Sequence, residues 1–328
     1  MRSIVVGTRR SLLAKTQTGH VVTALQKEFP DLIIEVKEIV TKGDRIIDIP
    51  LAEVGGKGLF ISEIESALLS GDIDFAVHSL KDVPAEVAPG LMIGAIPKRE
   101  DERDLLITRE GHTLSMLPIG ARIGTSSLRR SAQLRNVRED VQIEVLRGNI
   151  DTRLRRLEEL DAIVLAAAGL KRMNWWDGEA DISYHGDKLI GFPLPLQDFL
   201  PAVGQGALAL ECRSNDETIR AMLAVLHDPA TAMQVEAERA FLKAVGGSCQ
   251  VPIGAHATIA YKDGSIEADG ERNVVIRLDG MIGAPDGAEL IRGVQEGEDA
   301  QRVGQQLGEH LLYAGGDRIL QQLAIETR

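Results

Sequence analysis

Nine arginines and no lysine occupy residues 121 to 156, a stretch that holds only four acidic residues. The chain as a whole is acidic, with 37 Lys and Arg against 49 Asp and Glu and a net charge of −12. The guanidinium fork binds carboxylates and phosphates through two parallel hydrogen bonds, which a lysine ammonium cannot do. An arginine-rich stretch in an acidic protein therefore indicates a small ligand with planar anionic groups rather than a polymer.

Two turns that join a predicted strand to a predicted helix are suited to hold an anion. Gly124-Thr125-Ser126-Ser127 leads into a helix whose first turn carries Arg129 and Arg130, and Gly7-Thr8-Arg9-Arg10-Ser11 repeats this arrangement near the start of the chain. Backbone N–H groups and hydroxyls converge at such junctions. Ser11 and either Ser126 or Ser127 are equally well explained as helix caps. Arg129 and Arg130 oppose the helix dipole, and an anion between them would resolve that conflict.

Arg147-Gly148-Asn149 ends a predicted strand and opens a helix that carries Arg153. On a helix that starts near Asn149, Arg153 lies one turn along, and its side chain could point back toward Arg147 at the start of the helix. A solvated basic face explains the other arginines of this helix and the preceding one better: Arg135, Arg138, Arg155 and Arg156.

His78-Ser79-Leu80-Lys81-Asp82 ends a short apolar strand. Open α/β sheets place their ligand contacts at this edge, beyond the carboxyl ends of the strands. Asp82 and Lys81 could instead form an ion pair on a loop, and His78 is better explained as a structural histidine than as a base. Gly55-Gly56-Lys57-Gly58 is flexible and cationic but resembles a phosphate loop only loosely.

Cys249 follows two glycines and precedes a Pro-terminated turn. A cysteine on exposed loop backbone is a candidate nucleophile or attachment site, although no base is assigned to it here. Cys212 follows the apolar run 207–210 and is expected to be inert packing. Two cysteines supply neither a disulfide framework nor the spacing of a metal site.

The elements that must position these residues alternate between strand and helix over the first three quarters of the chain. Strands are expected at 3–7, 32–40, 73–78, 105–108, 143–146 and 162–166, and helices at 11–28, 60–69, 128–137 and 150–160. A charged break at Arg99-Glu100-Asp101 separates two such series. This order predicts two α/β domains.

Residues 173–199 are rich in Gly, Pro and Trp and are expected to form an irregular surface insert rather than core. Helices are expected at 217–226, 232–244, 300–312 and 319–324. Beyond Pro252, four Asp-Gly pairs at 263, 269, 279 and 286 predict turns between antiparallel strands. The last part of the chain is therefore expected to be a smaller α+β domain.

Composition argues against several classes of protein. The longest strongly apolar stretch, 162–170, is too short to cross a bilayer, and the N-terminus reads as a strand rather than a secretory signal. Negative net charge and 3% aromatic residues disfavour nucleic-acid binding. We expect a cytoplasmic protein, and nothing in the sequence requires an oligomer, so a monomer is predicted.

Nine collinear motifs in this sequence resemble the hydroxymethylbilane synthase (porphobilinogen deaminase) family. They are Gly-Thr-Arg-Arg-Ser at 7–11, Val-Gly-Gly-Lys-Gly-Leu-Phe at 54–60, Ala-Val-His-Ser-Leu-Lys-Asp-Val-Pro at 76–84, Arg-Glu-Asp at 99–101, Gly-Thr-Ser-Ser-Leu-Arg-Arg at 124–130, Leu-Arg-Gly-Asn at 146–149, Ala-Gly-Leu-Lys-Arg at 168–172, Pro-Ala-Val-Gly-Gln-Gly-Ala at 201–207 and Cys-Gln-Val-Pro-Ile-Gly at 249–254.

The resemblance implies two α/β domains similar to type-2 periplasmic binding proteins, which flank a cleft, and a smaller α+β C-terminal domain. Domain 1 would comprise 1–98 with 206–224, to which the chain returns. Domain 2 would comprise 99–205, with the insert 173–199, and domain 3 would comprise 225–328 and carry the cofactor cysteine.

The resemblance also implies a reaction. A dipyrromethane cofactor is joined to Cys249 by a thioether, and four porphobilinogen molecules lose ammonia as they are added to it. Hydrolysis then frees linear hydroxymethylbilane. Porphobilinogen and the growing polypyrrole are the partners, with no nucleic acid, membrane or metal. Asp82 matches the family's catalytic aspartate.

The acetate and propionate of every ring supply a reason for the arginine-rich stretch. Residues that match cofactor contacts are Lys81, Ser79, Thr125, Ser126, Ser127, Arg129, Arg130, Arg147 and Gly148. Residues that match substrate contacts are Arg9, Gln17, Lys57, Arg153, Arg172 and Gln205.

Two positions and one segment depart from the family pattern, and the segment is 173–199, which is longer than in the short bacterial forms. Glu53 stands where relatives often have a lysine, and Ser248 stands where glycine is common. The main alternative is a non-catalytic anion-binding protein of the periplasmic class, which would give no reason for Cys249 or for a third domain. The mass of the intact protein separates the two hypotheses.

Overall fold

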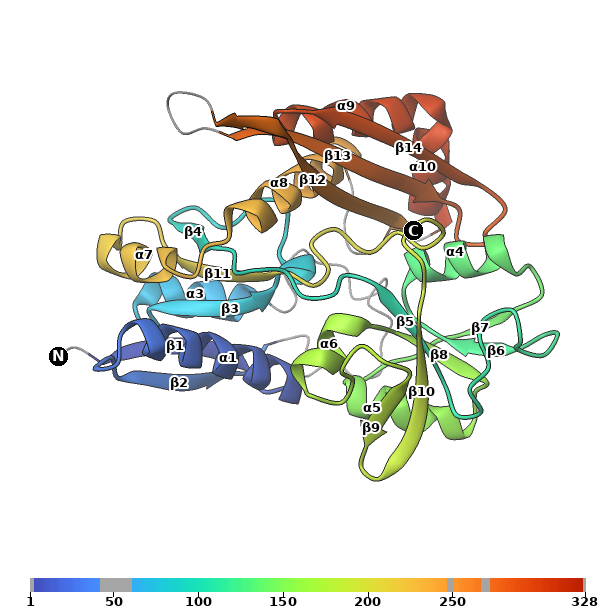
Figure 1. The fold of residues 1–328 in the computed structure, drawn as a ribbon, viewed down its shortest axis with the longest axis horizontal. Helices are drawn as coiled ribbons and strands as arrows, with labels where there is room; N and C mark the ends of the chain where they lie inside the picture. The colour runs from blue at the N-terminus through green and yellow to red at the C-terminus, as the bar shows by residue number, and fades with distance from the viewer. Residues whose placement is uncertain (1–2, 42–60, 247–250, 267–271, 327–328) are drawn as a thin grey trace.

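The structure is a computed structural model that describes residues 3–41, 61–246, 251–266 and 272–326 (Figure 1). Lys57, Glu53, Ser248 and Cys249 lie outside the described residues, and so does the Asp-Gly pair at 269–270.

The first α/β unit is built on a five-stranded sheet in the order β2-β1-β3-β11-β4. Its strands are β1 (Ile4–Arg9), β2 (Ile34–Ile39), β3 (Phe75–Ser79), β4 (Leu91–Ala95) and β11 (Leu208–Arg213), and its helices are α1 (Leu12–Glu28), α3 (Ser62–Ser70) and α7 (Glu217–Ala224). β1 runs parallel to β2 and β3, whereas β11 runs antiparallel to both of its neighbours. The chain therefore returns to this sheet late in the sequence.

The second α/β unit is built on a six-stranded sheet in the order β7-β6-β8-β5-β10-β9. Its strands are β5 (Asp104–Thr108), β6 (Arg122–Gly124), β7 (Gln142–Glu144), β8 (Ala162–Ala166), β9 (Asp181–Tyr184) and β10 (Asp187–Pro193), and its helices are α4 (Leu128–Val137), α5 (Ile150–Arg155) and α6 (Ala167–Arg172). As β11 does in the first sheet, β5 runs antiparallel to both neighbours. The repeated order confirms two α/β units of the predicted class.

The C-terminal unit is a three-stranded antiparallel sheet with helices packed on it (Figure 1). Its elements are α8 (Pro229–Ala244), β12 (Ile253–Ile266), β13 (Arg272–Gly283), β14 (Leu290–Gly297), α9 (Ala300–Leu311) and α10 (Asp317–Glu326). Phe241 of α8, Leu278 of β13 and Leu307 of α9 are fully buried in one core. The predicted α+β class of this part of the chain is confirmed, while the exact boundaries of the three domains stay a prediction.

The prediction that 173–199 is a surface insert outside the core is wrong. β9 and β10 form a hairpin that extends the second sheet at the side of β5. Trp176, Ile182 and Leu189 of this segment are at most 2% exposed and belong to the core of the unit. Alternating apolar residues in two short strands face the core, and the glycines between them conceal that period in the sequence.

The prediction of turns at the Asp-Gly pairs is only partly right. A turn closed by the Gly287 N–H and the Ala284 carbonyl joins β13 to β14, so the pair at 286–287 behaves as expected. The pairs at 263–264 and 279–280 lie inside β12 and β13. A Cβ on Gly280 would approach Leu307 to 2.8 Å, so close packing of α9 on the sheet explains this glycine.

Two segments, 99–104 and 200–206, connect the α/β units and lie side by side. The Glu100 N–H donates to the Gly206 carbonyl at 3.0 Å. Gly206 has φ of +86°, and a Cβ there would lie 2.3 Å from the Glu100 carbonyl oxygen. Only glycine fits this crossing point, because it tolerates both the positive φ and the close approach.

Candidate active site

Asp82 lies at the carboxyl end of β3, on a single 3₁₀ turn formed by Leu80–Asp82. The Val83 N–H closes this turn on the Leu80 carbonyl at 3.0 Å, and the buried Leu80 side chain anchors it. The Asp82 side chain is left exposed. The backbone thus presents this carboxylate at the sheet edge, as the sequence predicts.

Ser79 and Gln17 hold the end of β3 against α1. The Gln17 amide Nε2 donates to Ser79 Oγ at 3.0 Å, and Gln17 is only 4% exposed. A small cavity of about 70 Å³ opens beside this contact and is lined by Arg9, Ser11, Leu13, Ala14, Gln17, Ile61, Val77, His78, Ser79 and Asp82. Four of the predicted site residues therefore share one cavity.

Lys81 is half-buried next to Asp82. Burial lowers the pKa of its ammonium group to about 8, against the opposing charge of Asp82. Near neutral pH this lysine is a cation that loses its proton more easily than an exposed one.

Arg147 lies on the loop after β7, and Arg153 lies on the short helix α5 that this loop opens. Asn149 caps α5 by accepting a hydrogen bond from the Thr152 N–H at 2.9 Å, and Gly148 has φ of +95°. Arg153 Nε donates to the Gly148 carbonyl at 2.9 Å, so this side chain turns back toward the loop as predicted.

The pKa of Arg153 falls to about 10 because the side chain is largely removed from water and lies near the charge of Arg130. Asp82 acts in the opposite direction, and Arg147 adds to the repulsion. Asp82 and Arg153 therefore lie within range of each other's charge, although they come from different α/β units.

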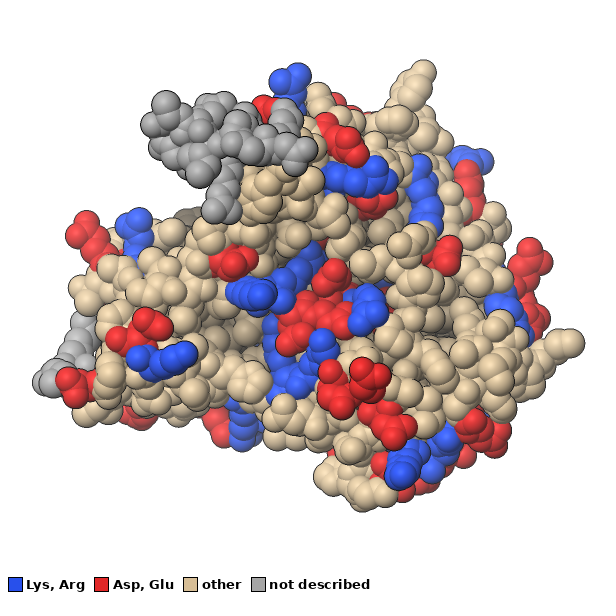
Figure 2. Space-filling model, in the orientation of Figure 1, with Lys and Arg blue, Asp and Glu red and all other residues tan. Residues whose placement is uncertain are grey.

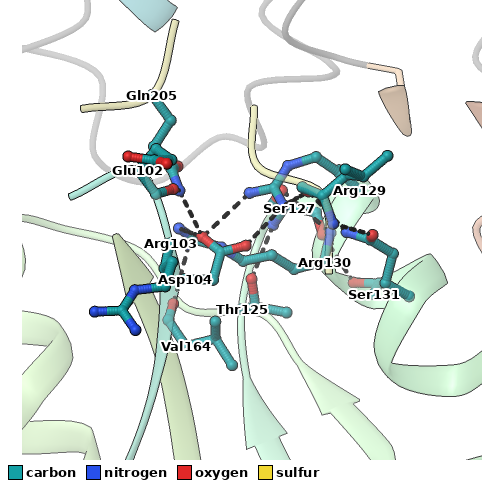
Figure 3. A network of polar contacts seen from close by, with 12 residues as sticks. Glu102, Arg103, Asp104, Thr125, Ser127, Arg129, Arg130, Ser131, Val164 and Gln205 are labelled. Atoms are coloured by element: carbon teal, nitrogen blue, oxygen red, sulfur yellow. Dashed lines mark hydrogen bonds and ion pairs between the residues drawn. The ribbon is translucent and has the colours of Figure 1, made fainter. Parts of the chain in front are cut away.

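Arg129 and Arg130 have their anion inside the protein (Figure 3). Arg129 Nη1 donates to Asp104 Oδ2 at 2.6 Å, and Arg130 Nη2 donates to Asp104 Oδ1 at 2.7 Å. Burial alone would raise the pKa of Asp104, but the two guanidinium groups hold it well below its usual range. The sequence predicted a ligand anion between the arginines, whereas the chain itself supplies the anion through Asp104, and contacts of these arginines with a ligand stay a prediction.

The three hydroxyls that precede α4 have separate roles in the structure. Ser127 caps the helix by accepting from the Arg130 N–H at 3.4 Å, and Thr125 Oγ1 accepts from the Ser127 N–H at 3.2 Å. Ser126 Oγ bonds both backbone groups of Leu146, which fastens the arginine loop to this turn. Ser11 likewise caps α1. The capping interpretation holds for Ser11 and Ser127, while ligand contacts by these residues stay a prediction.

Gln205 and Arg172 are buried where the connecting segments cross. Gln205 Nε2 donates to Asp104 Oδ1 at 2.9 Å, and Arg172 Nη2 donates to the Gly206 carbonyl at 2.6 Å. Their exposed fractions are 1% and 8%. Both side chains hold the crossing together, and their predicted contact with substrate is not tested by this arrangement.

His78 and Cys212 behave as the simpler hypotheses predicted. His78 Nε2 lies 2.9 Å from Glu211 Oε2, and both side chains are buried, which confirms a structural histidine. Cys212 is fully buried, and burial raises the pKa of its thiol to about 11, which confirms an inert cysteine.

Sequence reasoning missed Asp104, the carboxylate that joins both arginines of α4 to the crossing segments. It begins the buried strand β5 and is 0% exposed. A charged residue at the head of a strongly apolar run was the available signal. Figure 2 shows Lys and Arg gathered with Asp and Glu near the middle of one face, where Figure 1 draws the junction of the three units.

Within the described part of the chain, two kinds of feature are absent. None of its His, Cys, Asp and Glu side chains form a group of three or more that could hold a metal ion. None of its helices is long and apolar enough to cross a membrane.

Comparison with known proteins gives consistent matches along the whole chain. Residues 4–221 match the family model "Porphobilinogen deaminase, dipyromethane cofactor binding domain", and 232–313 match "Porphobilinogen deaminase, C-terminal domain". A porphobilinogen deaminase of Brevibacillus brevis is 52% identical over 98% of each chain. Those of Syntrophobacter fumaroxidans and Geobacillus kaustophilus are each 49% identical, over 98% and 99% of each chain. The two α/β sheets, the exposed aspartate on the turn after β3 and these matches agree, and the chain belongs to the porphobilinogen deaminase family.

Proposed function

We propose that this chain is a hydroxymethylbilane synthase, a transferase of tetrapyrrole synthesis. It condenses four porphobilinogen molecules, with loss of ammonia, onto a dipyrromethane primer and releases linear hydroxymethylbilane by hydrolysis. The observation that carries the proposal is the exposed Asp82 carboxylate, which follows Lys81 and lies within range of the charge of Arg153 from the second α/β unit. Membership of the family over the full chain supports it.

The residues present fit a bound dipyrromethane, which supplies a pyrrole carbon at which the chain is lengthened. Its carboxylates need cations and hydroxyls as partners. Within the described residues, Arg147 makes no hydrogen bond or ion pair, so its guanidinium group can bind a carboxylate. Lys81, Ser79 and Thr125 would hold the group with Ser126, Ser127, Arg129, Arg130 and Gly148, and Cys249 would carry the thioether.

Asp82 is positioned to accept a hydrogen bond from a pyrrole N–H and to transfer protons as a general acid or base. No described residue donates a hydrogen bond to its carboxylate, so both oxygens can accept from a ligand N–H. A general acid or base of this kind contributes about 10²–10⁴ in rate. Its negative charge also stabilises positive charge that develops on a ring during loss of ammonia.

Substrate carboxylates would be held by Arg9 and Gln17, which line the cavity, and by Arg153, which lies within range of the charge of Asp82. Lys57, from the segment outside the described residues, would add a further cation. We propose that Arg172 and Gln205 act less directly, because both donate to groups of the crossing segments. Their replacement is then expected to alter how the two α/β units meet as well as substrate binding.

The mass of the intact protein tests the proposal. A covalent dipyrromethane adds roughly 420 Da to the chain, and adding porphobilinogen should produce a ladder of discrete increments. Cys249→Ser should remove the added mass, whereas the matched variant Cys212→Ser should keep it. A bare chain that binds anionic pyrroles without turnover would instead support the non-catalytic anion-binding protein.

Asp82→Ala tests the catalytic carboxylate. Turnover should be abolished while the added mass remains. The reason is that the cofactor is proposed to be held covalently by Cys249 and not by the Asp82 side chain. Glu139→Gln is the matched control, since Glu139 is an exposed carboxylate at the far end of α4. Normal turnover in Asp82→Ala would show that another carboxylate does the chemistry.

A monomeric state, a cytoplasmic location and the absence of a nucleic-acid partner stay predictions of the sequence. Light scattering coupled to size-exclusion chromatography tests the first, and steeply salt-dependent DNA binding would contradict the third.

A further inference from the structure

The β9–β10 hairpin ends in an unusual turn. His185 and Gly186 form its two-residue loop, with φ of +48° and +92°. Two positive φ values define a type I′ turn, in which Asn, Asp or Gly normally take the first position. A histidine held in this left-handed conformation points to a role for its side chain.

The hairpin tip is fastened to the first turn of α5. Tyr184 Oη donates to Asp151 Oδ1 at 2.7 Å, and His185 Nε2 lies 3.2 Å from the same oxygen. The other oxygen, Oδ2, accepts from Arg155 Nη2 at 2.6 Å. The Tyr184 hydrogen bond is the main reason that the pKa of Asp151 lies below its usual value. Figure 1 shows β9 beside α5.

The aromatic rings of this tip support one another. Trp175 and Tyr184 pack edge to face with centroids 5.1 Å apart, and Tyr184 and His185 do so at 4.5 Å. At the base of the hairpin, Trp176 is 2% exposed and Lys171 lies 5.7 Å from its ring centroid. The hairpin is thus a packed element that reaches from the core of the second α/β unit to α5.

Helix α5 needs such support. It has six residues, Ile150–Arg155, and helices of this length are not stable on their own. Leu154 fixes its buried side, while Asp151 receives the contacts from the hairpin. The same helix carries Arg153, whose Nε donates to the Gly148 carbonyl at 2.9 Å and whose charge interacts with those of Asp82 and Arg147.

We propose that Tyr184 and His185 are positioning residues for porphobilinogen condensation, because they hold α5 so that Arg153 faces ligand carboxylates beside Asp82. This inference rests on the proposed function for its kinetic consequences. Extension of the sheet does not account for these contacts, since the strand pairing of β9 with β10 needs neither the hydroxyl nor the imidazole.

The test compares Tyr184→Phe, His185→Asn and both together with Ser183→Ala, an exposed position on the same strand. Asn retains the left-handed turn that His185 adopts. Loss of the hydrogen bonds to the Asp151 carboxylate should raise KM for porphobilinogen about tenfold, with kcat changed less than about twofold. Ser183→Ala should match the parent enzyme, and thermal unfolding checks that each variant is folded.

The same substitutions in a chain that also carries Arg153→Lys show whether the change in KM depends on Arg153. In Arg153→Lys, adding Tyr184→Phe should raise KM no further, because the group being positioned is already altered. An unchanged KM in the first series, or a full additional rise in the Arg153→Lys background, would overturn the inference.

Amide hydrogen exchange tests the brace without relying on activity. Residues 150–155 should exchange faster in Tyr184→Phe than in the parent chain, and Ser183→Ala should not differ. Equal exchange in all three proteins would overturn the inference even in a protein that turns over porphobilinogen. An inactive parent enzyme would refute only the proposed function, since the exchange measurement still decides the role of Tyr184.

Discussion

Asp104 supplies the negative charge in a buried group that also contains two arginines and a glutamine amide. Replacing Asp104 by Asn removes that charge. Asp104 is 0% exposed and accepts from Arg129 at 2.6 and 3.3 Å, from Arg130 at 2.7 and 3.0 Å, and from Gln205 at 2.9 Å. Asn keeps the shape of the side chain but turns one acceptor oxygen into an NH₂ donor that faces other donors. Two guanidinium groups are then left with carbonyl partners only.

The expected loss is about 3–5 kcal/mol of unfolding free energy, the usual effect of breaking a buried ion pair from one side. The Leu200 and Val164 carbonyls still accept from Arg129 and Arg130, which keeps the loss within that range. Glu289→Gln is the matched control. Its partner is Arg318 and both side chains are largely exposed, so about 0–1 kcal/mol is expected.

Urea unfolding followed by tryptophan fluorescence measures the loss where it occurs. The chain has two tryptophans, Trp175 and Trp176, and both lie in the α/β unit that contains Asp104. The transition midpoint should fall strongly in Asp104→Asn and hardly at all in Glu289→Gln. A difference below about 1 kcal/mol between Asp104→Asn and the parent would refute the assignment of this carboxylate as the buried counter-ion.

The difference should also depend on pH. The pKa of Asp104 is lower in the folded chain than the value of about 3.9 expected when unfolded, so the unfolded chain binds the extra proton first. Its contribution is therefore complete above about pH 4 and falls by up to about 1.4 kcal/mol per unit as the pH drops below that value. A gap between parent and Asp104→Asn that stays constant from pH 4.5 to 3 would contradict this reasoning.

Three further predictions concern the groups around this centre. Because the pKa of Lys81 is about 8, kcat/KM should fall as the pH rises through that value, and Lys81→Arg should retain activity to higher pH. Identical pH profiles of the two proteins would contradict a role for the ammonium charge. Gly206→Ala should lower the thermal unfolding temperature more than Gly71→Ala, because both have positive φ but only Gly206 would place a Cβ against backbone. Arg239→Gln should reduce kcat several-fold, because Arg239 donates hydrogen bonds to the carbonyls of the three residues after Asp82. Equal turnover would show that this loop does not need the hydrogen bonds from Arg239.

Local sequence pattern predicted most elements that carry the site. The helix expected at 128–137 is α4, and the strand expected at 162–166 is β8. An anion near Arg129 and Arg130 was expected from a ligand, and the chain supplies it through Asp104 instead. Its source could not be predicted, because Asp104 lies 25 residues earlier and meets α4 only through the order of strands in the second sheet.

The hairpin at β9–β10 was misjudged for a related reason. Gly, Pro and Trp usually indicate irregular structure, and the strands here are four and seven residues long. Pairing of β10 with β5 gives Leu189 and Ile182 a buried face. Tertiary pairing of this kind cannot be read from a short apolar alternation alone.

Helix α8 links the C-terminal unit to both parts of the site through two consecutive residues. Glu238 is fully buried and accepts from Arg99 at 2.6 Å and from the Gly204 N–H at 2.7 Å, so it holds both connecting segments. Arg239 contacts the loop that follows Asp82. Helix α8 therefore supports the crossing of the connecting segments and the loop after Asp82 through two neighbouring side chains.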